Sequence, residues 1–303
     1  MCHTGKYLLL WQRLQRRRNS SIISPYPPLT LHAFHTGNAE TLSTWADSLS
    51  LPSEKVTFFN FLASHDGIGL TPARGFLSET AVNQMAARIK ANGGYVSTKN
   101  NPDGTQSPYE LNINYLDALS NPDHEEAVAL IAQRFLTSQA IMLALRGVPG
   151  IYFHSLFGSQ NWAAGVAQTG HNRTINRQKL TINELTNELE SNNGLRSLVF
   201  NGYRKLLQAR TSHPAFHPNG RQKILHLHES VFAVLRISEN GRSWVLCLQN
   251  VSAETIQLAL NFNFTPTPIQ GAKNLINGNT FPINKNQCTI TMRPFTAIWL
   301  TSC

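Results

Sequence analysis

Residues 56–69 read VTFFNFLASHDGIG, and this stretch carries the first clue to the fold. Residues 56–63 are mostly apolar and rich in aromatic and β-branched side chains, which is typical of a strand buried on both faces. His65 and Asp66 follow in a glycine-punctuated loop, at the carboxyl end of a strand where β/α enzymes carry catalytic groups. A carboxylate there is costly unless it is paired or faces a ligand, so Asp66 is a candidate functional residue. A turn-capping Asp is the alternative.

Helices and strands alternate around this stretch. A cap at Ser78 and the Gly93–Gly94 pair bound one expected helix, and Gly147 is expected to end another. Strands are expected at residues 29–34, 56–63 and 149–156, helices at 39–49, 78–92, 123–146 and 194–211, and long loops at 95–122 and from 157 to about 193.

The pattern changes after residues 213–218. Short strand-like runs separated by turns then predict a small antiparallel β-sandwich. The expected strands are 223–229, 231–238, 243–251, 255–260, 273–276 and 289–300. The sequence therefore predicts an α/β plus all-β chain in three parts: a poorly ordered leader at 1–24, a β/α part at 25–212, and the sandwich at 213–303.

The β/α part contains too few strands for a closed barrel. An eight-stranded β/α barrel takes about 250 residues, and residues 25–211 supply about three strands. They form either a small open sheet or the last part of a barrel.

Composition excludes several classes of protein. The 303 residues carry a net charge of +9, but beyond an Arg-rich stretch at 12–18 the basic residues are spread thinly, which favours solvated charge over nucleic-acid binding. No run approaches the roughly 18 apolar residues of a membrane span. The four cysteines lack CxxC spacing and suit a reducing cytoplasm.

Four ordered blocks resemble one subgroup of a known enzyme family. NFLASHDGIGLTPARGFLSE (60–79), SPYELNINYLDALS (107–120), ALRGVPGIYFHSLFG (144–158) and GHNRTINRQKL (170–180) resemble the sucrose-phosphorylase-type enzymes of glycoside hydrolase family 13. The resemblance covers about residues 27–300. It implies strands six to eight of a (β/α)8 barrel, followed by the family's C-terminal β-sandwich.

The resemblance also implies a chemistry. Such enzymes transfer a glucosyl group with retention, using a nucleophilic and an acid/base carboxylate, and pass it to phosphate to give a sugar 1-phosphate. Asp66 matches a third carboxylate that stabilises the transition state, and His65 matches its neighbouring histidine. The nucleophile and acid/base regions would precede residue 27 and have no counterpart in residues 1–24, which contain no Asp or Glu.

The chain alone is therefore expected to be inactive. Residual activity would need a missing N-terminal half-barrel as a partner, with a sugar and inorganic phosphate as substrates. The alternative is a non-catalytic truncated remnant or a weak carbohydrate-binding module.

The same resemblance brings in candidate substrate-binding residues. Tyr109, Glu110 and Asn112 match a loop near the acceptor and phosphate side, although YELNIN could equally be a plain strand. Arg173 and Arg177 could bind phosphate or an anionic acceptor through forked hydrogen bonds, or simply be exposed to solvent.

The remaining candidates favour structural roles. His154 is expected in the last strand. A core histidine is the more frequent role at such a position, and a catalytic base is the less frequent one. His226 and His228 alternate along a strand without a third ligand in view, which argues against a metal site. Trp162 and Trp244 are expected to pack. No metal and no cofactor is expected.

Overall fold

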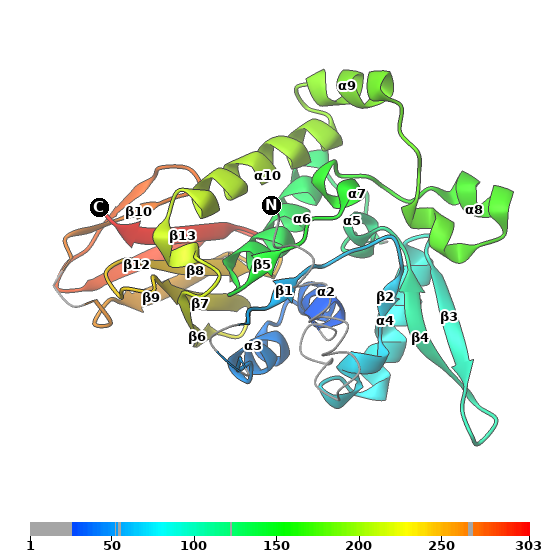
Figure 1. Cartoon of the computed structure of the whole chain (residues 1–303), viewed down its shortest axis with the longest axis horizontal. Helices are drawn as coiled ribbons and strands as arrows, with labels where there is room; N and C mark the ends of the chain where they lie inside the picture. The colour runs from blue at the N-terminus through cyan, green and yellow to red at the C-terminus, as the bar shows by residue number, and fades with distance from the viewer. Residues whose placement is uncertain (1–25, 52, 54–55, 122, 266–268) are drawn as a thin grey trace.

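The computed structural model describes residues 26–51, 53, 56–121, 123–265 and 269–303. The expected leader at 1–24 lies outside these residues. Helices and short strands of the first two thirds of the chain lie against a layered antiparallel β structure formed by the last third (Figure 1). None of the helices in these ranges is long and apolar enough to cross a bilayer.

The elements follow each other in one chain order. The helices are α2 (Tyr26–Thr36), α3 (Glu40–Asp47), α4 (Glu79–Ala91), α5 (Tyr115–Ala118), α6 (Val128–Ala144), α7 (Phe153–Leu156), α8 (Ala163–Thr169), α9 (Ile182–Glu190) and α10 (Leu195–Thr211), with 3-10 turns η1 (Thr71–Gly75), η2 (Asn172–Asn176) and η3 (Pro214–Phe216). The strands are β1 (Phe59–Asn60), β2 (Ile68–Gly69), β3 (Tyr95–Asn100), β4 (Gln106–Asn112), β5 (Val148–Pro149), β6 (Arg221–His228), β7 (Val231–Ile237), β8 (Trp244–Asn250), β9 (Ile256–Asn261), β10 (Gly271–Asn274), β11 (Thr280–Pro282), β12 (Gln287–Met292) and β13 (Ala297–Ser302).

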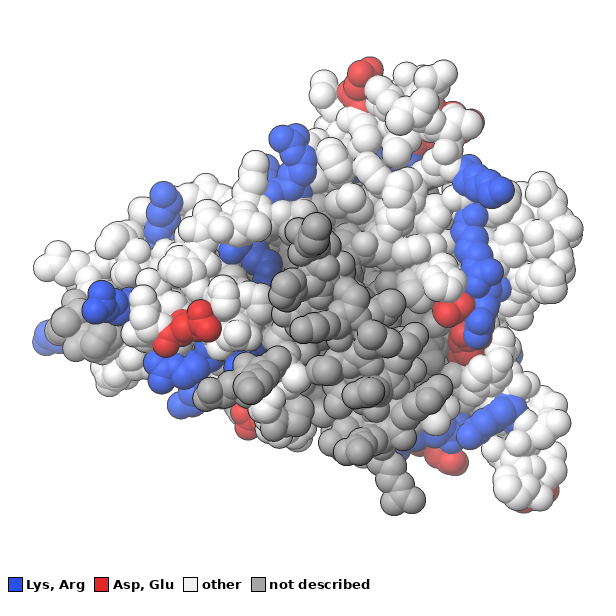
Figure 2. Space-filling view, viewed as in Figure 1, with Lys and Arg blue, Asp and Glu red and all other residues white. Residues whose placement is uncertain are grey.

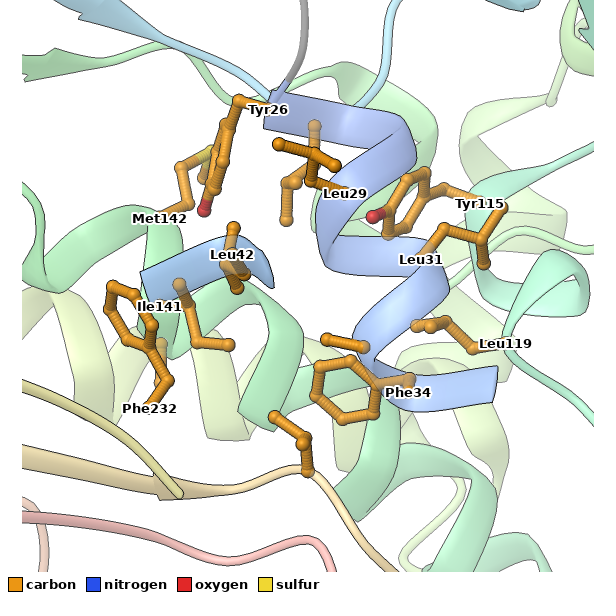
Figure 3. Packing of buried hydrophobic residues seen from close by; sticks show 14 of the residues in the cluster. Tyr26, Leu29, Leu31, Phe34, Leu42, Tyr115, Leu119, Ile141, Met142 and Phe232 are labelled. Atoms are coloured by element: carbon orange, nitrogen blue, oxygen red, sulfur yellow. The ribbon is translucent and has the colours of Figure 1, made fainter. Parts of the chain in front are cut away.

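The strand expected at 29–34 is wrong, because these residues form most of helix α2. Eight of the eleven residues of α2 are buried. A short run of apolar residues that is buried on all sides gives no periodicity by which a helix can be told from a strand. Figure 3 shows α2 enclosed by side chains from several other elements, among them Leu42 of α3, Tyr115 of α5 and Phe232 of β7.

The strands expected at 56–63 and 149–156 shrink to a short parallel pair, β1 and β5. Phe59 lies opposite Val148, and Asn60 lies opposite Pro149. Phe59 and Val148 remain 44% and 42% exposed. Among the described residues no further strand pairs with β1 or β5. The aromatic and β-branched residues that flank the pair therefore have no neighbouring strand to extend the sheet.

Residues 95–122, expected as a loop, contain the hairpin β3–β4 and the helix α5. The strands pair in antiparallel register from Tyr95 opposite Asn112 to Asn100 opposite Gln106, with a bulge after Ser97. Most of β3 is exposed, which explains its polar sequence, because a ribbon with solvent on its faces needs no apolar alternation.

Two more expectations change in detail. The helix expected at 123–146 starts only at Val128. Glu126 precedes this helix and forms an ion pair with Arg134. The loop expected from 157 to about 193 contains α8, η2 and α9. By contrast, the helices expected at 39–49, 78–92 and 194–211 are confirmed as α3, α4 and α10, and Ser78 caps α4 by accepting from the Ala81 N–H.

The C-terminal part is antiparallel, as expected. Six strands form one sheet in the order β11-β10-β13-β8-β7-β6, and β9 and β12 pair separately. The run expected as one strand at 289–300 divides into β12 and β13, because Phe295 between them has a positive φ of 48°. The short strand β11 was not expected.

The six-stranded sheet is covered on both faces. Phe232 and Val234 of β7 join the core that the helices share, whereas Val231, Ala233 and Leu235 join the core beneath β9 and β12. This alternation follows from the period of two along a strand.

One contact ties the two ends of the described chain together. The ring of Phe34 on α2 stacks on that of Phe295, with centroids 6.1 Å apart. The guanidinium of Arg134 lies 5.1 Å from the centre of the same Phe295 ring, and the hydroxyl of Thr137 donates to its carbonyl. The helical core therefore needs residues from both ends.

Candidate active site

Asp66 lies in the loop between β1 and β2. The loop is fixed locally, because the Asp66 N–H donates to the Ser64 hydroxyl at 3.1 Å. The Asp66 carboxylate remains partly exposed, with 39% of its side-chain surface accessible. The carboxylate is thus held in place while open to a ligand.

Arg173 of η2 joins Asp66 to Glu110 of β4. Its Nη1 donates to Asp66 Oδ1 at 3.0 Å, and its Nη2 and Nε donate to the two oxygens of Glu110 at 2.9 and 3.3 Å. Glu110 is buried, so this forked contact balances a carboxylate that solvent does not reach. The bond to Glu110 raises the pKa of Arg173 further.

Arg177 is the second arginine on the same carboxylate. Its Nη2 donates to Asp66 Oδ1 at 3.2 Å, and its Nε donates to the carbonyl of His65 at 2.9 Å. The His65 imidazole lies 3.6 Å from Asp66 Oδ2 and is largely exposed. Five of the seven predicted site residues therefore come together: His65, Asp66, Glu110, Arg173 and Arg177.

A cavity of about 310 Å³ opens beside this cluster. Asp66 and Glu110 contribute to its wall, together with Tyr152, Asn176 and Asn114. The Tyr152 hydroxyl donates to the Asn176 carbonyl at 2.6 Å, and the Asn176 amide lies 3.4 Å from the carbonyl of Asp66. Burial raises the pKa of Tyr152, which keeps its hydroxyl protonated.

Tyr152 and Asn176 were missed by sequence reasoning. Asn176 stands between the two candidate arginines in RTINR (173–177), and this position was the available signal. Tyr152 follows the short strand β5, at the same carboxyl edge as the Asp66 loop.

Gly67 allows the Asp66 loop to sit directly on β4. A Cβ at Gly67 would lie 2.6 Å from the Leu111 carbonyl oxygen, 2.7 Å from Glu110 Cγ and 3.1 Å from Asn112 Oδ1. This close approach brings the carboxylates of Asp66 and Glu110 within reach of one guanidinium.

The structure places Asn112 and Tyr109 outside the wall of the cavity. Asn112 is fully buried, its amide donates to Ser97 Oγ at 2.9 Å, and its Oδ1 has no hydrogen-bond partner among the described residues. Tyr109 is 36% exposed on β4, one residue before Glu110. Its carbonyl accepts from the Leu70 N–H.

His154 lies on α7 and not in a strand. It is buried, and its Nδ1 lies 2.9 Å from Ser159 Oγ. Burial and the nearby charge of Arg196 lower its pKa, so the imidazole is neutral at pH 7.

The other candidates lie away from the cavity. The Trp162 indole packs over Gly165, and His226 and His228 are exposed on β6. The described residues contain no group of three or more His, Cys, Asp and Glu side chains placed to hold a metal ion. Figure 2 shows that, among the described residues of the visible face, acidic side chains lie directly beside basic ones in several small groups.

The fold is shared with enzymes of known structure. It matches the sucrose 6F-phosphate phosphorylase from Thermoanaerobacter thermosaccharolyticum with a TM-score of 0.61 at 19% identity, over 88% of this chain and 46% of that one. It matches an Anoxybacillus alpha-amylase with a TM-score of 0.57 at 12% identity, over 92% of this chain and 46% of that one. The structure is therefore alpha-amylase-like.

Sequence comparison identifies relatives of this chain within the alpha-amylase-like class. The chain is 50% identical over 226 residues to the glucosylglycerate phosphorylase of Spirochaeta thermophila, covering 75% of this chain and 38% of that protein. It is 41% identical to the Escherichia coli glucosylglycerate phosphorylase, over 90% of this chain and 46% of that protein. No protein-family model matches. The chain is a homologue of the glucosylglycerate and sucrose phosphorylases of glycoside hydrolase family 13, and it spans less than half the length of these relatives.

Proposed function

We propose that this chain supplies the sugar- and phosphate-binding half of a retaining glucosyl-transferring site. The observation that supports this proposal is that two arginines hold the Asp66 carboxylate at a cavity, beside the buried Glu110. In the proposed reaction the bond between glucosyl C1 and the donor oxygen breaks. The donor oxygen takes a proton from the acid/base carboxyl group and leaves as an alcohol, and an oxygen of inorganic phosphate ends up bonded to C1, which gives glucose 1-phosphate.

Asp66 is proposed to bind sugar hydroxyls more strongly as positive charge develops on the ring. Its Oδ1 already accepts from Arg173 and Arg177, so Oδ2, on the side of His65, is the oxygen left for a sugar hydroxyl. His65 would hydrogen-bond a neighbouring hydroxyl. Tyr152 and Asn176 add polar groups to the cavity.

Arg177 is proposed as the phosphate-binding residue of the pair. Arg173 pairs with two carboxylates, whereas Asp66 is the single carboxylate that pairs with Arg177 among the described residues; the two side chains are similarly exposed, at 46% and 43%. Phosphate or a carboxylate-bearing acceptor could share its remaining N–H groups. Tyr109, one residue from Glu110, would contact the same acceptor. Asn112 would support the site from the buried end of β4, beneath the cavity.

The described residues alone are proposed not to catalyse transfer. A retaining mechanism needs a free nucleophilic carboxylate and a second carboxyl group that can exchange a proton. The site's two carboxylates, Asp66 and Glu110, both bind Arg173. A partner segment that adds strands beside β1 and β5 would have to supply both groups, so residues 25–212 would be strands six to eight of a barrel and 213–303 its C-terminal sandwich.

The donor is proposed to be glucosylglycerate. The relatives of that name are 41–50% identical to this chain, whereas the Agrobacterium vitis sucrose phosphorylase is 28% identical.

The three described cysteines are free thiols, which keeps a reducing cytoplasm as the expected compartment.

The test is release of glucose 1-phosphate from glucosylglycerate and inorganic phosphate. The full 303-residue chain is assayed alone and with a co-expressed N-terminal half of a related phosphorylase. We expect product only with the added half, lost in Asp66→Asn and kept in Asp47→Asn, a matched change at an exposed position on α3.

Each outcome has a clear meaning. Product from the chain alone would contradict the proposed need for a partner segment. Glucose binding by calorimetry without product in either assay would favour the carbohydrate-binding alternative.

A further inference from the structure

We propose that Asp117 is a positioning residue that sets the place of the arginine pair on Asp66. It would do so by anchoring residues 158–162 to α5, and these residues in turn hold η2. This inference rests on the proposed function only in assigning a role to the arginines. The positioning itself can be tested without any substrate.

The anchor consists of hydrogen bonds from one segment to α5 and its flanks. Asp117 Oδ2 accepts from the Asn161 N–H at 2.5 Å, and its Oδ1 lies 3.4 Å from the Gln160 amide nitrogen. The Asn161 side chain accepts from the Asn114 N–H at 2.8 Å and donates to the Asn92 carbonyl at 3.0 Å. The segment is thus fixed to α5 and to the end of α4.

The next residue carries this placement to η2. The Trp162 N–H donates to the carbonyl of Ile175 at 3.1 Å, and Ile175 is fully buried. Ile175 lies between Arg173 and Arg177, whose guanidinium groups both reach Asp66. A shift of the 158–162 segment would therefore move both arginines relative to the carboxylate.

The described groups that face Asp117 are uncharged. They are the Asn161 peptide and the Gln160 amide from the 158–162 segment, and the Asn92 amide from the end of α4, which donates to the Asp117 carbonyl. Burial raises the pKa of Asp117 to about 6, and the two bonds to its carboxylate oppose this only in part. Within the described part of the chain this carboxylate is enclosed without a counter-charge.

This enclosure couples the segment to pH. When the segment opens, Asp117 meets water and its pKa falls toward the ordinary value of 3.8. The closed state binds the proton more tightly, so protonation favours closure. Opening should increase about tenfold per pH unit between pH 4 and 6 and level off above pH 6, a total of about 100-fold.

The experiment measures amide hydrogen exchange of the full chain between pH 4.5 and 8, corrected for the intrinsic pH dependence of exchange. The segments followed are 158–162 and 171–177. We expect both to open more as the pH rises to 6. Asp117→Ala, which removes the acceptor, should open both segments at least tenfold at every pH.

Asp117→Asn is the decisive variant because it keeps an acceptor oxygen and removes the charge. It should abolish the pH step and leave both segments more protected than in the wild type at pH 7.5. Asp103→Asn, at the exposed tip of the β3–β4 hairpin, is the matched control and should keep the step.

The proposal is overturned if Asp117→Ala leaves 171–177 as protected as the wild type, or if Asp117→Asn retains the pH step. Binding of inorganic phosphate is measured separately by calorimetry. Wild-type chain that binds no phosphate but shows the exchange pattern would contradict the proposed function and leave the positioning role supported.

Discussion

Arg236 of β7 donates from Nη1 to the carbonyl oxygen of Ala144, at the end of α6, over 2.9 Å. Arg236 is fully buried, and its other donors reach the carbonyls of His217 and Arg221. A second buried arginine, Arg210 of α10, donates to the carbonyls of Leu143 and Gly147. Two cations therefore satisfy the carbonyl groups at the negative end of the α6 dipole.

Arg236→Met should destabilise the chain by about 2–4 kcal/mol, because the buried carbonyl of Ala144 and the partly buried carbonyls of His217 and Arg221 each lose a donor. Burial lowers the pKa of Arg236 to about 9, so the guanidinium remains charged at pH 7. The measurement is urea unfolding followed by circular dichroism. Arg242→Met, in an exposed turn, is the control and should change stability by less than about 0.5 kcal/mol. Equal losses of stability in the two variants would show that Arg236 does not stabilise the contact between β7 and α6.

His35 should make the chain acid-sensitive. Burial, together with the charge of Arg88, lowers its pKa to about 3, and its Nε2 lies 2.8 Å from the Ala118 carbonyl. The unfolded chain takes up a proton near pH 6.5, whereas the folded chain does so only near pH 3. Stability is therefore lost as the pH falls through this window, by about 1.4 kcal/mol per unit.

Urea unfolding at pH 6.5 and 4.5 measures this slope. His35→Gln should lose less stability between the two pH values than the wild type, by about 2–3 kcal/mol. The control, His228→Gln on the exposed side of β6, should keep the wild-type slope. If His35→Gln also keeps it, another group carries the acid sensitivity.

Gly67→Ala should disturb the candidate site. The added methyl group would meet Leu111 and Glu110 at 2.6–2.7 Å, so the Asp66 loop or β4 must shift. We expect a loss of about 1–3 kcal/mol in stability and weaker glucose binding by calorimetry. Gly75→Ala is the matched control, because Gly75 does not line the cavity and nothing lies within 4 Å of its Cβ position. Similar binding by both variants would contradict the proposed packing role.

The local sequence signals predicted helix ends better than they separated buried helix from strand. Ser78 and Gly93–Gly94 bound α4 as expected. Helix α2 was missed because residues 29–34 are buried on every side, so the choice between helix and strand depended on distant contacts such as that with Phe295.

The sequence likewise predicted part of the candidate site. Asp66 and the two arginines could be chosen from their places in loops, and the structure brings them together. That Arg173 also binds Glu110 could not be foreseen, because the contact spans 63 residues and depends on the register of β2 with β4. Asn112 was expected beside the substrate, but it is fully buried and lies behind Gly67, a residue of the cavity wall, instead of lining the cavity itself.

The stacking of Phe34 on Phe295 also bears on how the chain is made. The two residues are about 260 positions apart, and at about 5–20 residues per second their synthesis is separated by roughly 13–52 s. During that interval α2 has left the ribosome without the ring that covers it. Until residue 295 is made, the apolar side chains of α2 lack this contact, and in the meantime they can associate with other exposed apolar surface.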